Sequence, residues 1–135
     1  MKSRVFAVLF SASALIAGFV PHLAHAASVS ILEPADGAVV SSPFAVKFGV
    51  NGMEVKPATD LTPNSGHHHL LINLGPIKAG EVIPVDAQHL HFGKGQTEAS
   101  VTLPPGKYSL TLQFASGKHE SYGADLSKTI NVTVR

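Results

Sequence analysis

The stretch Pro104-Pro105-Gly106-Lys107-Tyr108-Ser109-Leu110-Thr111-Leu112-Gln113-Phe114 decides the fold class of this chain. Its Pro-Pro-Gly start predicts a tight corner, because proline fixes φ and glycine accepts unusual backbone angles. Leu110, Leu112 and Phe114 then alternate with polar residues, which is the pattern of a β-strand with one buried face. The stretch therefore predicts a corner that opens a half-buried strand.

The position of Tyr108 and the rest of the chain extend this prediction to a whole domain. A tyrosine just after such a corner, at the start of a strand, is typical of the tyrosine corner of immunoglobulin-like sandwiches. Apolar and polar residues alternate in further short segments, and helical periodicity is almost absent. The other expected strands are 29–31, 44–50, 67–74, 89–92, 98–103 and 126–135. We expect a single all-β domain, an immunoglobulin-like or cupredoxin-like antiparallel β-sandwich.

The first residues have the pattern of a signal peptide. Lys2 and Arg4 precede an apolar run over 5–20, and Ala24-His25-Ala26 has the small-x-small pattern of a cleavage site. We expect a signal peptide over 1–26, cleavage after Ala26, and a mature domain over 27–135. The mature protein is then periplasmic or secreted, with no membrane span after cleavage.

Charge and cysteine content exclude several classes of function. Loss of Lys2 and Arg4 turns the formal net charge of +1 into −1, so no basic surface for nucleic acid is expected. The chain has no cysteine, which excludes disulfides, thiolate metal sites and blue-copper electron transfer. Core packing alone must then hold the fold.

Two histidine clusters carry the functional signal. Five of the eight histidines fall within 66–74 and 89–98, both predicted to contain strands. If Leu70, Ile72 and Leu74 face the core, His68 shares their face and is expected to be a hydrogen-bonded, partly buried residue. Four other imidazoles face away from the core and are the candidate metal ligands: His67, His69, His89 and His91.

Neutral imidazoles without thiolate are suited to Cu(II), Zn(II) or Ni(II), and we expect copper or zinc with no organic cofactor. Weaker candidates for the same site are His68, Glu98, as an oxygen ligand or hydrogen-bond acceptor, and His119 in a late loop. The sequence therefore predicts a non-catalytic metal-binding protein with a metal ion as its partner.

Two other interpretations stay open. In the first, the histidines form a structural polar network. The domain is then an interaction or ligand-binding module for a component of the cell envelope, with two long Pro/Gly loops for recognition. The second is an enzyme, which we do not expect, since no nucleophile, paired-carboxylate or His-Glu-x-x-His motif is present. A copper oxygenase would need cleavage after Ala24 to expose His25.

Four motifs resemble a bacterial exported family that is catalogued only as domain of unknown function 4399. They are PADGAVVSSP at 34–43, GHHHLLI at 66–72, HLHFGKGQTE at 89–98 and LPPG at 103–106. The resemblance covers nearly all of the expected mature chain. It implies a small periplasmic β domain with no established activity.

Overall fold

The computed structural model describes residues 25–135, so the expected signal peptide falls almost entirely outside the described residues. Within that range the chain forms short and medium strands with a single 3-10 turn, η1 (Ala124–Leu126). No helix in the described part of the chain is long and apolar enough to cross a membrane. The strands are β1 (Ser28–Glu33), β2 (Ala38–Val40), β3 (Phe44–Asn51), β4 (Glu54–Val55), β5 (Ser65–Ile72), β6 (His89–His91), β7 (Glu98–Val101), β8 (Gly106–Ala115) and β9 (Ser127–Val134).

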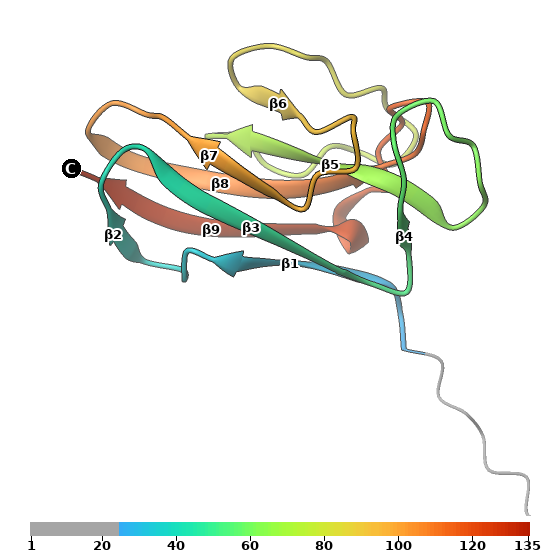
Figure 1. Ribbon diagram of the computed structural model, residues 1–135, viewed down its shortest axis with the longest axis horizontal. Helices are drawn as coiled ribbons and strands as arrows, with labels where there is room; N and C mark the ends of the chain where they lie inside the picture. Colours follow the sequence, from blue (N-terminus) through green and yellow to red (C-terminus); the bar gives the residue numbers. More distant parts are fainter. Residues whose placement is uncertain (1–24) are drawn as a thin grey trace, which may run out of the picture.

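The strands form two packed sheets, which confirms the predicted β-sandwich (Figure 1). The smaller sheet has the order β1-β3-β7, and the larger has the order β2-β9-β8-β5-β4, with β6 added to β5. The strict antiparallel expectation needs one correction, because β2 pairs with β9 and β4 pairs with β5 in parallel. Both β2 and β4 are short edge strands that the chain forms while it passes between the sheets.

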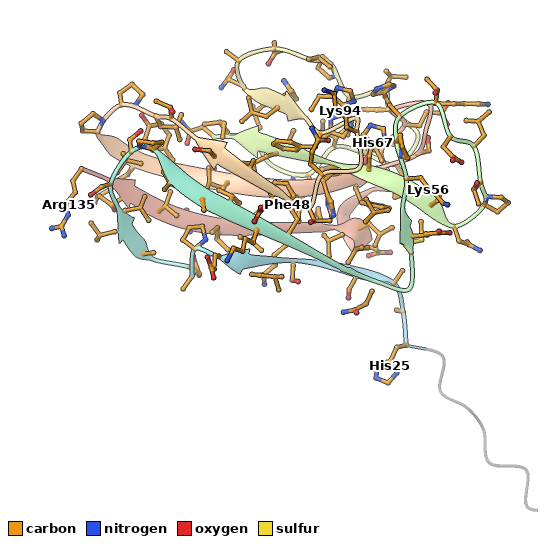
Figure 2. The ribbon with its side chains drawn as sticks, in the orientation of Figure 1. His25, Phe48, Lys56, His67, Lys94 and Arg135 are labelled. Carbon is orange, nitrogen blue, oxygen red and sulfur yellow. The ribbon has the colours of Figure 1, made fainter. Side chains whose placement is uncertain are left out.

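One face of each central strand fills the core between the sheets. In β5 and β8 the register places Leu70 opposite Leu112 and Ile72 opposite Leu110, and these side chains point inward. Phe48 of β3 packs against them from the other sheet, as Figure 2 shows between the layers. Burial of such apolar side chains is the main stabilising contribution in a chain without cross-links.

The predicted tyrosine corner is present at the start of β8. The hydroxyl of Tyr108 donates a hydrogen bond of 2.8 Å to the carbonyl oxygen of Pro104. This bond fixes the corner from which β8 enters the centre of the larger sheet. The alternation of Leu110, Leu112 and Phe114 therefore points into the core as the sequence predicted.

The outer face of the larger sheet is also buried along β5 and the second half of β8, because loops cover it there. All eight residues of β5 are buried, those that point away from the sandwich included. Ile83, from the connection between β5 and β6, packs on Leu71 and Ala115 in a second small cluster outside the main core. Strand β6 pairs with the edge of β5 in the larger sheet, and in Figure 1 the connection between these two strands rises above β5.

Candidate metal centre

Strand β5 provides the first two imidazoles of the site. His67 and His69 are two residues apart, so both point to the outer face of the sheet, and both are fully buried. Their Nε2 atoms are 3.1 Å apart. One of these nitrogens must carry a proton in this contact, because a hydrogen bond between two imidazoles needs one donor and one acceptor.

Strand β6 adds His91 beside this pair. The antiparallel register places His91 opposite His69, and its ring centroid lies 5.0 Å from that of His67 and 5.1 Å from that of His69. Gly93 makes room for this ring, since a Cβ on Gly93 would lie 2.3 Å from Cε1 and 2.6 Å from Nε2 of His91. The lack of a side chain at Gly93 is what leaves room for the imidazole.

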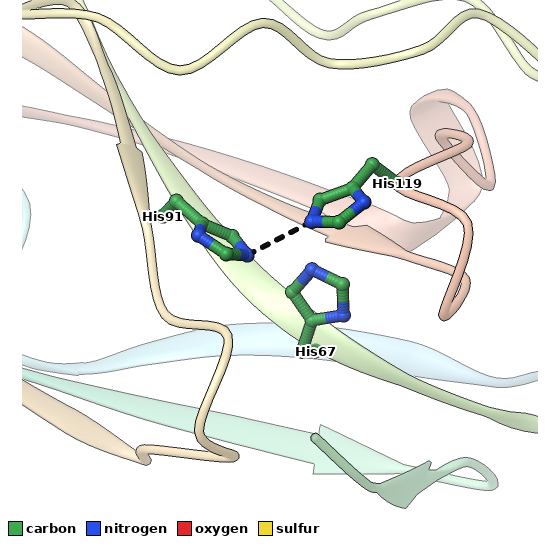
Figure 3. Close-up of side chains that lie close together, drawn as sticks. All are labelled: His67, His91 and His119. Atoms are coloured by element: carbon green, nitrogen blue, oxygen red, sulfur yellow. Dashed lines mark hydrogen bonds between the residues drawn. The ribbon is translucent and has the colours of Figure 1, made fainter. Parts of the chain in front are cut away.

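The loop after β8 brings in His119, which completes the group. This residue has a positive φ of 63°, a conformation that histidine adopts more readily than most residues, and its amide donates to the carbonyl of Ser116 in a tight turn. Its Nε2 lies 3.1 Å from Nε2 of His91. Figure 3 shows the ring of His67 pointing toward the gap between His91 and His119.

The resulting geometry is that of a possible metal site. One ligand nitrogen from each of His67, His91 and His119 lies within 4.8 Å of the others, and His69 touches His67 on the side. The three rings come from β5, β6 and a loop, which are far apart in the sequence. A small rotation of side chains would let these nitrogens share one ion at bond lengths of about 2.0–2.1 Å.

Burial lowers the pKa of three imidazoles in this cluster, His67, His69 and His91, and so favours their neutral form. Burial lowers the pKa of His67 to about 4, with a further contribution from the nearby His119 and His91. Burial lowers the pKa of His69 to about 3, again with the neighbouring histidines adding to the effect. The pKa of His91 is lowered by burial and by His119. Neutral rings keep a free lone pair, which is the form that binds a metal ion.

His68 faces the core, as predicted, but its surroundings differ from the expectation. The ring is fully buried between Phe48 and Phe114, at centroid distances of 5.1 Å and 5.0 Å. Neither ring nitrogen has a hydrogen-bond partner among residues 25–135, so the prediction of a hydrogen-bonded, partly buried residue is wrong. Burial, and to a smaller extent His67, lowers the pKa of His68 to about 4.

The structure leaves the other candidates apart from this group. His89 lies on β6, but its Nδ1 is 2.8 Å from Oδ1 of Asp86, in a turn that also holds its backbone amide. Glu98 is exposed on β7 of the smaller sheet, where the register places it opposite Lys47. In Figure 2, His25 lies beyond the start of β1, well apart from His67.

Gln113 is a buried residue of the site that the sequence analysis missed. It lies opposite His69 on β8 and faces the same outer side. Its Nε2 donates to the carbonyls of Phe114, Gly123 and Leu126, and its Oε1 accepts a bond of 3.1 Å from the amide of Ile77. The side chain therefore joins both loops that cover the histidines. The signal available in the sequence was a polar residue at an outward position of the strand that pairs with the histidine strand.

Comparison with known proteins places the chain in a family. The model of a family described as a domain of unknown function, DUF4399, matches residues 46–135. The chain belongs to this family, as its motifs indicated. The matched region contains His67, His69, His91 and His119. No curated protein and no solved structure matches the chain significantly.

Proposed function

We propose that this protein is a non-catalytic metal-binding protein of the bacterial periplasm that handles copper or zinc. The observation that carries the proposal is the meeting of His67, His91 and His119, whose ligand atoms lie within 4.8 Å of one another. Imidazole nitrogen is a preferred donor for both Cu(II) and Zn(II). The signal-peptide pattern of residues 1–26 supports the periplasmic location.

Burial argues against a purely structural role for these rings. Nδ1 of His67 and Nδ1 of His69 have no hydrogen-bond partner among the described residues, although both rings are fully buried. An unpaired buried polar group costs about 1–3 kcal/mol. A network built only for stability would satisfy these atoms or replace the rings by apolar side chains. An ion bound at the Nε2 atoms, which face the other rings, would contribute binding free energy that offsets this cost.

The composition of the group supports binding rather than catalysis. Within residues 25–135, the set of side chains close enough to hold one ion consists of histidines alone, with no carboxylate to act as a general base. Glu98, the carboxylate that a hydrolytic site would need, lies exposed on the other sheet. We therefore assign the site to holding an ion and not to a reaction.

Metal titration of the exported chain, purified without a histidine tag, tests the proposal. We expect Zn(II) or Cu(II) to bind at one equivalent with a dissociation constant below about 1 µM at pH 7, since three or more imidazoles converge. His67→Ala, His91→Ala and His119→Ala should each weaken binding at least tenfold. Isothermal titration calorimetry with a competing chelator measures these constants.

His89→Ala is the matched control for this experiment. It removes an imidazole from the same strand as His91, but one that contacts Asp86 rather than the cluster. We expect it to bind the ion as the unmodified protein does. The proposal fails if neither ion binds more tightly than micromolar, or if the three cluster variants bind as well as His89→Ala.

A further inference from the structure

Four imidazoles lie close together here, although the nitrogens that all lie within 4.8 Å of one another belong to three of them, His67, His91 and His119. The six distances between the ring centroids of His67, His69, His91 and His119 are 4.9, 5.0, 4.9, 5.1, 5.9 and 4.8 Å. The two closest nitrogen contacts, between the two β5 rings and between His91 and His119, are both 3.1 Å and join Nε2 atoms. Every ring is thus a near neighbour of the other three.

These distances discriminate between coordination geometries. With a metal–nitrogen bond of about 2.05 Å and about 1.15 Å from nitrogen to ring centre, each centroid lies about 3.2 Å from the ion. A tetrahedron then separates all six pairs by about 5.2 Å, whereas a square gives about 4.5 Å for four pairs and about 6.4 Å for two. The pair His69–His119 is the longest at 5.9 Å, but its opposite pair, His67–His91, is only 5.0 Å. The spacing of the ring centroids is therefore close to that of a tetrahedron and far from that of a square, and the ring of His69 must turn to bring its nitrogen to the other three.

We propose that the site is a closed tetrahedral zinc site in which Nε2 of His67, His69, His91 and His119 are the four ligands. This inference rests on the proposed function and selects between its two ions. Zn(II) has no geometric preference of its own and is four-coordinate and tetrahedral in closed sites, whereas Cu(II) favours a square or tetragonal arrangement.

The burial of the site agrees with complete coordination by the protein. His67 and His69 are fully buried, and His91 and His119 are half-buried under the loops that cover β5. Four protein ligands fill a tetrahedron and leave no position for water or substrate, which distinguishes storage and structural zinc sites from catalytic ones. The role of His69 is the new element, because three ligands alone would leave a position open.

X-ray absorption at the zinc edge of the loaded protein counts the ligands directly. We expect four imidazoles and no oxygen ligand. Substitution by Co(II) provides a second measurement, since tetrahedral Co(II) absorbs visible light far more strongly than Co(II) of higher coordination number. In His69→Ala we expect zinc affinity to fall at least tenfold and an oxygen ligand to replace the fourth imidazole. His69→Gln serves in its place if the alanine variant does not fold.

The outcomes separate this inference from the function on which it rests. If zinc binds with three imidazoles and an oxygen, or if His69→Ala binds zinc as tightly as His89→Ala does, the four-ligand site is wrong and the proposed function stands. If Cu(II) binds in place of zinc with a tetragonal electron paramagnetic resonance spectrum of four nitrogens, the tetrahedral assignment is wrong. If no ion binds, both proposals fail.

Discussion

The two faces of β5 are equally buried but are built in different ways. The inner face holds Leu70 and Ile72, which pack against side chains of the opposite sheet in the core of the sandwich. The outer face holds His67 and His69, which lie beside the short strand β6 and are covered by two loops. Burial on the inner face follows from apolar packing. On the outer face it encloses a group of imidazoles in contact with one another, whereas the inner face of β5 holds the one imidazole of His68 between two phenylalanine rings.

This difference separates the face that packs the core from the face that carries the proposed ion site. Apolar packing between sheets needs no exact placement of polar atoms, so the inner face can be predicted from alternation. The outer face requires particular contacts, such as the absence of a Cβ at Gly93 and the hydrogen bonds of Gln113. Variants on the two faces should therefore separate loss of folding stability from loss of ion binding.

Leu112→Ala should give the largest effect, because it removes a side chain from the core between the two sheets. Leu112 is fully buried opposite Leu70, and removal of such a side chain costs about 2–5 kcal/mol of unfolding free energy through lost burial and a cavity. Urea denaturation followed by circular dichroism measures the loss. The folded fraction should still bind the ion, and a loss of stability below about 1 kcal/mol would contradict the role given to this face.

Gln113→Leu is the matched change on the outer face of the same strand. It removes the hydrogen bonds to Ile77, Gly123 and Leu126 while keeping a side chain of similar size, and we expect a loss of about 2 kcal/mol. Hydrogen exchange should quicken in both covering loops, 74–88 and 116–126. Ser109→Ala, on the same face of β8, is the control, because the contact of Ser109 with Asn73 is made by its backbone amide and is kept in this variant. Unchanged exchange in either loop would show that Gln113 does not hold them.

Gly93→Ala tests the space given to His91. An added Cβ would lie 2.6 Å from Nε2 of His91, so the ring must rotate away, and we expect the affinity for the ion to fall about 10- to 100-fold, or about 1.4–2.7 kcal/mol. Gly75→Ala is the control, because a Cβ there meets no atom within 4 Å. Competition titration measures the affinity of both variants for the ion. Equal affinities would show that the His91 ring can move aside and still bind.

His68→Leu should give the smallest effect, and it tests the burial of a neutral imidazole on the inner face of β5. In the metal-free protein, His68 takes up a proton below pH 6.5 when the chain is unfolded, but its pKa is about 4 in the folded state. The free energy of unfolding therefore falls as the pH is lowered from 6.5 to 4. His68→Leu should make this fall shallower and raise the stability at pH 7 by about 1 kcal/mol. Urea titrations at pH 7 and pH 5 measure both effects. An unchanged slope would contradict the burial of a neutral ring.

The sequence predicted the parts of the molecule that depend on local pattern. Alternation placed Leu110, Leu112 and Phe114 in the core, and the corner predicted the bond of Tyr108 to Pro104. Period-two spacing also separated His68 from the outward His67 and His69. These features need only the geometry of a strand.

Features set by loop conformation were predicted weakly or not at all. His119, named from the sequence only as a weaker candidate, joins the group through a tight turn with positive φ, and His89 contacts Asp86 instead. The parallel edge strands β2 and β4 have too few residues to show a period. Gln113 has the pattern of an ordinary outward residue of a strand until the loops that it bonds are placed.

The spacing of the ligands has a further consequence for a chain that contains no cysteine. His67, His91 and His119 come from three segments, so one ion would cross-link the chain as two disulfides do, closing loops of roughly 25–30 residues each. Because unfolded histidines also bind ions, the gain would equal only the excess affinity of the folded site. The His67-His68-His69 run is the part of the unfolded chain most able to compete, so folding would draw the ion from neighbouring residues into a link across the whole sheet.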